Sequence, residues 1–184
     1  MKAAPPTGIL LLCVDMQPLF LKAIADSAQV LRRCAFAIAA ARGLELPVLF
    51  TEQVPQKLGG TAVELLQLVP SAGISAKSTF SAFATDEIRE KIISGSVTHL
   101  LLCGIETPVC VYQTTLDALA AGMLVTILGD AVGARRPDDA RICLEALIRA
   151  GAHVLPAESV FYALLGSVQH PFFKAYTQLV KSHA

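Results

Sequence analysis

Short apolar runs that alternate with helix-like stretches constrain the fold of this 184-residue chain more than any other feature of its sequence. Alternating strands and helices are typical of a parallel sheet covered by helices on both faces, and the strands of such a sheet read as continuous apolar runs. The expected strands are residues 8–14, 47–51, 74–77, 99–103, 124–128 and 153–155. Helices are expected at 30–42, 61–68, 86–93, 137–150, 159–165 and 171–181, and along the apolar stripe from Val109 to Met123. The sequence therefore predicts a doubly wound α/β fold.

The composition favours one domain over residues 1–184. Hydrophobic residues make up 54% of the chain and charged residues 16%, which suffices for a large core and leaves apolar surface for contacts between subunits. The sequence contains no internal repeat, low-complexity tract or linker. Fifteen basic and fifteen acidic residues cancel, so no basic field indicates nucleic-acid binding.

Nothing in the sequence predicts a membrane span, an exported protein or a zinc site. The apolar runs at 8–14 and 118–129 are shorter than the roughly 18 residues that a spanning helix needs. The N-terminal apolar run is ended by Asp15 and is too short for a signal peptide. Five cysteines form no CxxC pair and no zinc-ligand spacing. We therefore expect a soluble protein of the cytoplasm without a metal.

Three reactive side chains lie where expected strands or helices meet loops. Asp15 ends the first strand, Lys77 ends the third, and Cys110 lies near the start of the helix that follows the fourth strand. In doubly wound sheets, ligands bind beyond the carboxyl ends of the strands. A carboxylate, an ammonium group and a thiol are therefore expected to meet at one rim of the sheet.

These three groups together are suited to nucleophilic catalysis by the thiol. A thiol is a poor nucleophile until it loses its proton, at a reference pKa near 8.5. A helix N-terminus and a nearby lysine both lower that pKa, and a carboxylate can accept the proton. Backbone N–H groups at the loop-to-helix junction can stabilise an oxyanion. Taken singly, each residue also has a structural interpretation: Asp15 as a helix cap, Lys77 as a solvated surface residue and Cys110 as a small packed residue.

The sequence around these residues resembles that of the isochorismatase-like cysteine hydrolases, the relatives of nicotinamidases and N-carbamoylsarcosine amidases. The similarity is carried by residues 14–20 (VDMQPLF), 103–111 (CGIETPVCV), 114–119 (TTLDAL), 130–135 (DAVGAR) and 156–160 (PAESV). Residues 51–59 (TEQVPQKLG) and 170–174 (HPFFK) are similar to the isochorismatase-domain-containing branch. The matches cover nearly the whole chain in order. The resemblance implies a three-layer α/β/α fold with a mostly parallel six-stranded sheet in the order 3-2-1-4-5-6.

The resemblance also implies a role for each matched residue. Cys110 is expected to be the nucleophile, Asp15 the general base and Lys77 the group that stabilises charge. Gln17 is expected to support Asp15 or the loop beside it. The Ile105–Glu106 bond is expected to be the family's cis peptide, with the amides of Glu106 and Cys110 forming the oxyanion hole. The expected pocket wall, which is our own inference from the strand ends, consists of Phe20, Phe80 and Phe83.

Departures from the family pattern narrow the expected activity. Nicotinamidases carry an Asp-x-His metal site after the second strand, where this chain has Thr51, Glu52 and Gln53. We therefore expect no metal and no cofactor. Because isochorismatases that cleave a vinyl ether do not use the cysteine, the retained Cys110 favours hydrolysis of a small amide, carbamoyl or related acyl compound.

Other functions are disfavoured but stay open. A homo-oligomeric binding or scaffold protein that keeps the fold without activity is the main alternative, and homo-oligomers are common in the family. A haloacid-dehalogenase-like enzyme needs a second aspartate where Gln17 stands. The absence of GxGxxG and Walker-type loops disfavours dinucleotide and nucleoside triphosphate enzymes. A redox role for the thiol ranks lower because no CxxC partner is present. The expected partners are a small-molecule substrate and further copies of the chain, without nucleic acid or membrane.

Overall fold

A six-stranded, all-parallel sheet forms the centre of the protein. The computed structural model describes residues 6–183. The sheet has the order β3-β2-β1-β4-β5-β6, which confirms the predicted fold class and strand order. Its strands are β1 (Ile9–Val14), β2 (Val48–Gln53), β3 (Gly73–Lys77), β4 (His99–Ile105), β5 (Leu124–Gly133) and β6 (His153–Leu155).

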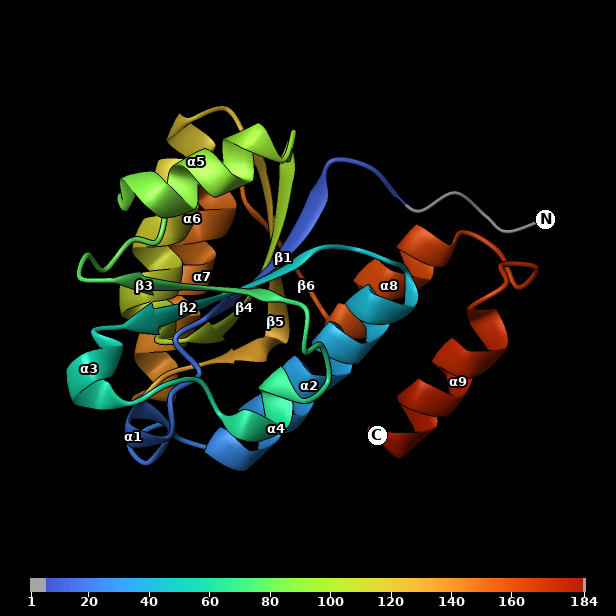
Figure 1. The fold of residues 1–184 in the computed structure, drawn as a ribbon, viewed down its shortest axis with the longest axis horizontal. Coiled ribbons are helices and arrows are strands. Elements are labelled where there is room, and N and C mark those ends of the chain that lie inside the picture. The colour runs from blue at the N-terminus through green and yellow to red at the C-terminus, as the bar shows by residue number, and fades with distance from the viewer. Residues whose placement is uncertain (1–5, 184) are drawn as a thin grey trace.

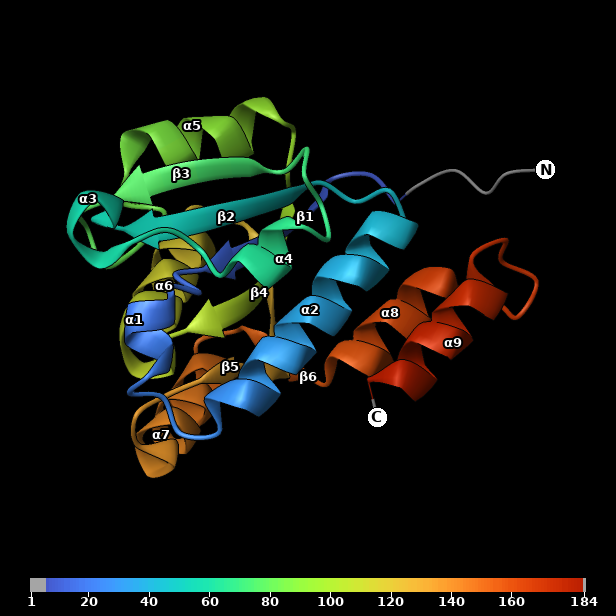
Figure 2. The same cartoon turned by 60° about the horizontal axis from the view of Figure 1, so that its bottom comes forward.

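Helices cover both faces of this sheet (Figures 1 and 2). One layer contains α2 (Ser27–Gly43), α4 (Val63–Leu66), α8 (Ala157–Leu165) and α9 (Phe173–Ser182). The other contains α5 (Asp86–Ser94), α6 (Tyr112–Ala120) and α7 (Pro137–Arg149). A π-helix, η1 (Thr107–Val111), leads into α6, and two short helices, α1 (Pro18–Leu21) and α3 (Pro55–Leu58), follow β1 and β2. The carboxyl ends of the central strands are thus surrounded by short, irregular elements.

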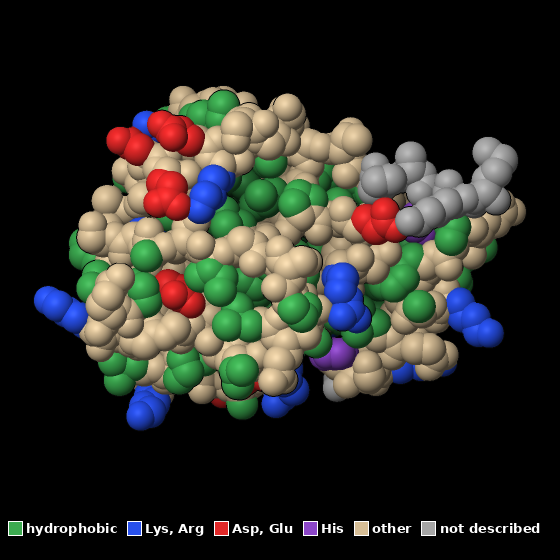
Figure 3. Space-filling view, in the orientation of Figure 1, with side chains coloured by type: hydrophobic (Ala, Val, Ile, Leu, Met, Phe, Trp, Pro, Cys, Tyr) green, Lys and Arg blue, Asp and Glu red, His purple; other side chains and the backbone are tan. Residues whose placement is uncertain are grey.

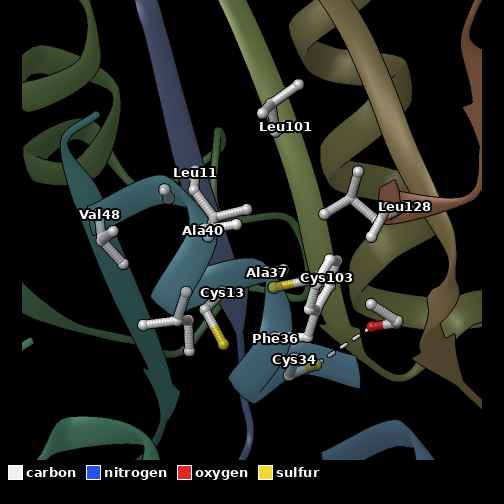
Figure 4. Close-up of a cluster of buried hydrophobic side chains, with 14 of the residues drawn as sticks. Leu11, Cys13, Cys34, Phe36, Ala37, Ala40, Val48, Leu101, Cys103 and Leu128 are labelled. Atoms are coloured by element: carbon white, nitrogen blue, oxygen red, sulfur yellow. Dashed lines mark hydrogen bonds between the residues drawn. The ribbon is translucent and has the colours of Figure 1, made fainter. Parts of the chain in front are cut away.

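Successive side chains of the central strands point to opposite faces of the sheet, and this alternation divides the core into two halves. Leu11 and Cys13 of β1 face the α2 layer, whereas Leu12 and Val14 face the layer of α5, α6 and α7. Figure 4 shows the α2 side, where Leu11, Cys13 and Leu101 lie against the helix. Burying one leucine side chain contributes about 1.5–3 kcal/mol, so both layers are held to the sheet by many such contacts.

A close approach of β1 and β4 requires a glycine at position 104. Gly104 has φ +110°, and a Cβ atom there would lie 2.1 Å from the carbonyl oxygen of Val14. Any side chain at this position would therefore push the two strands apart. The contact lies directly before the loop that carries Cys110, so it fixes where that loop leaves the sheet.

Most predicted elements are present, but several boundaries differ from those expected. Strands β2, β4 and β5 extend beyond their expected ends, to Gln53, Ile105 and Gly133, because these residues are still paired with a neighbouring strand. In β2 the added residues are polar but buried. The helix expected at 61–68 is the single turn α4. Helices α1 and α3 were not predicted, since each has four residues and is too short to show a periodic pattern.

Charged side chains of both signs lie scattered among apolar ones on the face drawn in Figure 3. This distribution agrees with the balanced composition of fifteen basic and fifteen acidic residues. Among residues 6–183, no helix has the length and apolar character needed to cross a bilayer.

Candidate active site

Asp15 is held at the end of β1 in an unusual backbone conformation. Its φ is +51°, in the left-handed region that costs a non-glycine residue about 1–3 kcal/mol. The backbone N–H of Asp15 donates to the carbonyl oxygen of Thr51 (3.1 Å), and the Thr51 hydroxyl donates to Asp15 Oδ1 (2.8 Å). Asp15 is 1% exposed. Neighbouring strand β2 therefore fixes both the backbone and the carboxylate.

Lys77 brings a buried ammonium group to this carboxylate from strand β3. Its Nζ lies 2.7 Å from Asp15 Oδ2, and both side chains are almost completely buried. The other acceptors around Nζ are Gln53 Oε1 at 2.6 Å, the carbonyl oxygens of Thr79 and Phe80 at 3.2 Å each, and Cys110 Sγ at 3.6 Å. A buried charge is tolerated only when it is paired and hydrogen-bonded, and this shell of acceptors meets that condition.

Cys110 lies in η1 and completes the trio. Cys110 is 8% exposed to solvent. Burial raises the pKa of the Cys110 thiol to about 12, and the negative charge of Asp15 and a hydrogen bond to it add to the rise. Lys77 and the Glu106 backbone lower that pKa but are outweighed. The lowering by Lys77 that the sequence suggests is therefore present, but desolvation raises the pKa of the thiol by more.

The polar end of β2 holds the trio together, which the sequence reasoning missed. Thr51 bonds to Asp15 and Gln53 bonds to Lys77, from the same strand. Between them, Glu52 Oε1 accepts hydrogen bonds from the Thr61 backbone N–H (2.7 Å) and hydroxyl (2.9 Å). The signal for this role was present: polar residues continue directly from an apolar strand.

Gln17 supports this arrangement through Gln53. Its Oε1 accepts from the Gln53 N–H (2.7 Å), and its Nε2 donates to the carbonyl oxygens of Gln53 (3.1 Å) and Gly59 (2.6 Å). Gln17 thus ties the segment after β1 to the segment after β2. It acts on the loop and on Gln53, which in turn contacts Lys77.

A cavity of about 380 Å³ opens over Asp15 and Cys110, whereas Lys77 is buried and does not line it. It is lined by Asp15, Phe20, Ala23, Ile24, Gln53, Phe80, Ile105, Glu106, Val109, Cys110 and Arg135. Phe20 and Phe80 line it as expected, and Phe80 is 57% exposed. Phe83 does not line it: the side chain is buried in the core beside α5, because the chain turns inward after Phe80. Arg135 is a lining residue that the sequence reasoning did not select.

The segment between β4 and η1 forms one wall of the cavity. The Ile105–Glu106 peptide bond is cis. The Glu106 carboxylate accepts hydrogen bonds from both the backbone N–H (3.2 Å) and the side-chain Nε (3.1 Å) of Arg135. The Thr107 hydroxyl donates to the Gly133 carbonyl oxygen (3.0 Å). These bonds anchor the wall to the end of β5.

Histidines take no part in lining this cavity among the described residues. His99 begins β4, where its Nε2 lies 2.8 Å from Thr126 Oγ1, and burial lowers the pKa of its imidazole. His99 therefore has a structural position in the sheet. The described residues contain one group of potential metal ligands, Cys13, Cys34 and Cys103, and these lie on the α2 side of the sheet rather than in the cavity.

Comparisons with known proteins place this chain and its fold in one family. The model of the isochorismatase domain matches residues 9–159. Isochorismatase domain-containing protein 2 of Pongo abelii is 36% identical over 100% of this chain and 87% of its own length. A Caenorhabditis elegans structure described as MAR1 ribonuclease has a TM-score of 0.89 and 31% identity, over 98% of this chain and 93% of that one.

A more distant solved structure has the same fold. The YcaC gene product of Escherichia coli, described as an octameric hydrolase of unknown specificity, has a TM-score of 0.85 and 20% identity, over 100% of this chain and 98% of that one. The family model covers most of the chain, and the curated relative is matched along this chain's full length. This protein therefore belongs to the isochorismatase-domain family.

Proposed function

We propose that this protein is a hydrolase that cleaves a small amide, carbamoyl or related acyl compound through a thioester on Cys110. The observation that carries the proposal is the position of Lys77 Nζ, 2.7 Å from Asp15 Oδ2 and 3.6 Å from Cys110 Sγ. A base and a nucleophile that line one cavity, with a buried cation in contact with both, form the set that nucleophilic catalysis requires.

In the first half of the reaction, the thiol proton moves to Asp15 while sulfur attacks the carbonyl carbon of the substrate. Because the pKa of the resting thiol is about 12, transfer to Asp15 accompanies the attack rather than preceding it. The amides of Glu106 and Cys110 are proposed to stabilise the oxyanion. Asp15 then returns the proton to the leaving nitrogen as the C–N bond breaks, leaving a thioester.

In the second half, water replaces the amine. Asp15 accepts a proton from the water as its oxygen attacks the thioester carbonyl. The C–S bond breaks, the acid leaves, and the proton on Asp15 returns to the Cys110 sulfur. Lys77 stays paired with the Asp15 carboxylate at 2.7 Å and holds it in place between the two steps. No oxidant or reductant is needed, so the cycle closes with water as the second substrate.

The cavity indicates the size and character of the substrate. Its volume of about 380 Å³ lies toward the small end of ligand pockets. Phe20, Ile24 and Val109 give it apolar walls, and Asp15 and Cys110 supply its reactive groups. A compact acyl compound with an aliphatic or flat body fits these walls.

The comparisons support hydrolysis and raise one alternative. The E. coli neighbour is described as a hydrolase, and the C. elegans neighbour as a ribonuclease. RNA cleavage needs accessible cations for the phosphates. Here the Lys77 side chain has no exposed surface, and the cation that lines the cavity among the described residues, Arg135, is 57% exposed but already paired with Glu106. We therefore favour acyl transfer over phosphodiester cleavage.

Mass spectrometry of the intact protein tests the proposal. Small amides and carbamoyl compounds are screened against the wild-type protein and Cys110→Ala, with acid quenching. We expect a substrate-dependent mass increase on Cys110 and loss of turnover in the variant. Unchanged turnover in Cys110→Ala would refute the thioester route. RNA cleavage that survives in Cys110→Ala and Asp15→Asn would place any ribonuclease activity outside this site.

A further inference from the structure

Three cysteines that are far apart in the sequence meet in the core, away from the cavity. Cys13 of β1, Cys34 of α2 and Cys103 of β4 have sulfur atoms that all lie within 4.8 Å of one another. Figure 4 shows the three side chains converging between these elements. Cys13 and Cys103 are register partners on adjacent parallel strands, so their side chains point to the same face. All three residues are completely buried.

A fourth sulfur and one carbonyl oxygen lie beside this thiol cluster. Met16 Sδ is 4.0 Å from Cys34 Sγ, and Met16 is completely buried. The Cys34 thiol donates to the carbonyl oxygen of Ala131 at 3.2 Å. The neighbouring core side chains are apolar, as in the cluster of α2, β1 and β4. The donors available to an ion here are thus soft thiolates and a thioether.

The geometry is close to that of a three-coordinate metal–sulfur site. A metal–thiolate bond of about 2.3 Å places three trigonal sulfur ligands about 4 Å apart. The three thiols therefore need to approach one another by less than about 1 Å. Structural zinc sites are closed by four ligands, usually cysteine and histidine. Thiolate and thioether ligands suit Cu(I) as well as zinc, but three thiols with one thioether lack the fourth cysteine or histidine of a structural zinc site.

We propose that Cys13, Cys34 and Cys103 form a binding site for a soft monovalent ion, Cu(I), with the Met16 thioether as a neighbouring fourth donor. The site is separate from Cys110 and does not depend on the proposed hydrolase activity. Binding exchanges protons for copper: each cysteine that coordinates as thiolate releases one proton to solvent. Copper enters and remains as Cu(I), so no electron is transferred.

Bound copper would join three elements that position the catalytic cavity. Cys13 lies two residues before Asp15, and Cys103 lies two residues before the cis peptide at Ile105–Glu106. The ion would link both strands to α2. It would therefore stabilise the folded state by mass action, because the unfolded chain does not hold the three sulfurs together.

Copper titration of the reduced full chain tests this proposal. The parent is Cys110→Ala with Cys143→Ala, which leaves only the three clustered cysteines. Cu(I) is added without oxygen in competition with a Cu(I) chelator, and retained copper is measured after desalting. We expect one copper per chain, a higher unfolding midpoint and a sulfur-only shell by X-ray absorption. Adding Cys34→Ala to the parent should abolish retention, with folding checked by circular dichroism.

Each outcome decides the proposal. Absence of retained copper in the parent, or copper that persists in folded Cys34→Ala, overturns it. Should Cys34→Ala fail to fold, the X-ray absorption spectrum of the parent decides: sulfur ligands support the site, and nitrogen or oxygen ligands refute it. A parallel titration with Zn²⁺ tests the choice of ion, and tighter retention of Zn²⁺ than of Cu(I) contradicts the assignment.

Discussion

The surroundings of the Cys110 thiol raise its pKa, so its reactivity depends on the groups beside it. Burial, the charge of Asp15 and the hydrogen bond to Asp15 raise the pKa of the thiol to about 12, against the lowering by Lys77. The same carboxylate that raises the pKa accepts the proton in the proposed reaction. The site thereby keeps its nucleophile unreactive until a substrate carbonyl is in place.

Alkylation of Cys110 is expected to accelerate with pH without a plateau. Below a pKa of about 12, the thiolate fraction rises tenfold for each pH unit, so the rate constant should rise by about this factor per unit from pH 7 to 10. The measurement is iodoacetamide labelling followed by mass spectrometry in a Cys143→Ala background, because Cys143 is the more accessible thiol. A plateau with a midpoint below pH 8 contradicts the raised pKa.

Asp15→Asn is expected to separate thiol reactivity from turnover. The substitution removes a negative charge and an acceptor that raise the pKa of Cys110, while Lys77 keeps lowering it. Alkylation at pH 8 should therefore become faster while hydrolysis is lost with the base. Lys77→Met is the opposite control and should slow alkylation. Slower alkylation in Asp15→Asn would show that Asp15 does not act on the thiol in this way.

At the scale of elements, the site depends on how closely β1 and β4 approach each other. Gly104 allows the backbone of β4 to lie against Val14, directly before the segment that carries Glu106 and Cys110. Strand β2 then fixes Asp15 and Lys77 through Thr51 and Gln53. The three strands therefore act as one rigid support for the cavity.

Gly104→Ala is expected to destabilise the protein far more than Gly122→Ala. Both glycines have positive φ, but an added Cβ would meet the Val14 carbonyl oxygen at 2.1 Å at position 104 and nothing within 4 Å at position 122. We expect a loss of more than about 4 kcal/mol in the free energy of unfolding for the first and about 1–2 kcal/mol for the second. Urea titration followed by circular dichroism measures both, and equal losses would argue against the close contact.

The fold and the meeting of Asp15, Lys77 and Cys110 could be predicted from sequence, but the surroundings of these three residues could not. Asp15 and Lys77 stand at strand ends, and parallel topology brings such ends to one rim. The roles of Thr51 and Gln53 depend on side-chain directions at the end of β2, which no local pattern encodes. Phe83 was wrongly predicted to line the pocket, because a hydrophobic residue that follows a strand can pack in the core as readily as in a pocket wall. The cluster of Cys13, Cys34 and Cys103 arises from tertiary contacts across at least 21 residues of chain.

For the whole molecule, exposed apolar side chains favour assembly of several copies. The larger exposed examples include Phe80, Ile142, Ile148, Leu155 and Val168. Phe80 also lines the cavity, so a neighbouring copy that covers it would complete one wall. We propose a homo-oligomer, and the E. coli neighbour described as octameric has the same fold.

Light scattering coupled to size-exclusion chromatography is expected to show a mass that is a multiple of 19.5 kDa. Phe80→Ser removes apolar surface at the cavity mouth and should shift the distribution toward smaller species, if that surface is shared between copies. Val168→Ser, at another exposed apolar residue, is the matched comparison. A monomer at micromolar concentration in the wild-type protein would contradict the assembly.

Lys77 is carried by β3, one of the two edge strands of the sheet, which is paired on one side only, with β2. Strands at a margin fray more readily than those inside a sheet, because half of their backbone groups lack a neighbouring strand. If β3 detached briefly from β2, the Lys77 ammonium group would leave the site, whereas Cys110 and Asp15 would stay in place because inner elements carry them. Gradual heating is therefore expected to abolish the proposed hydrolase activity before most of the secondary structure unfolds.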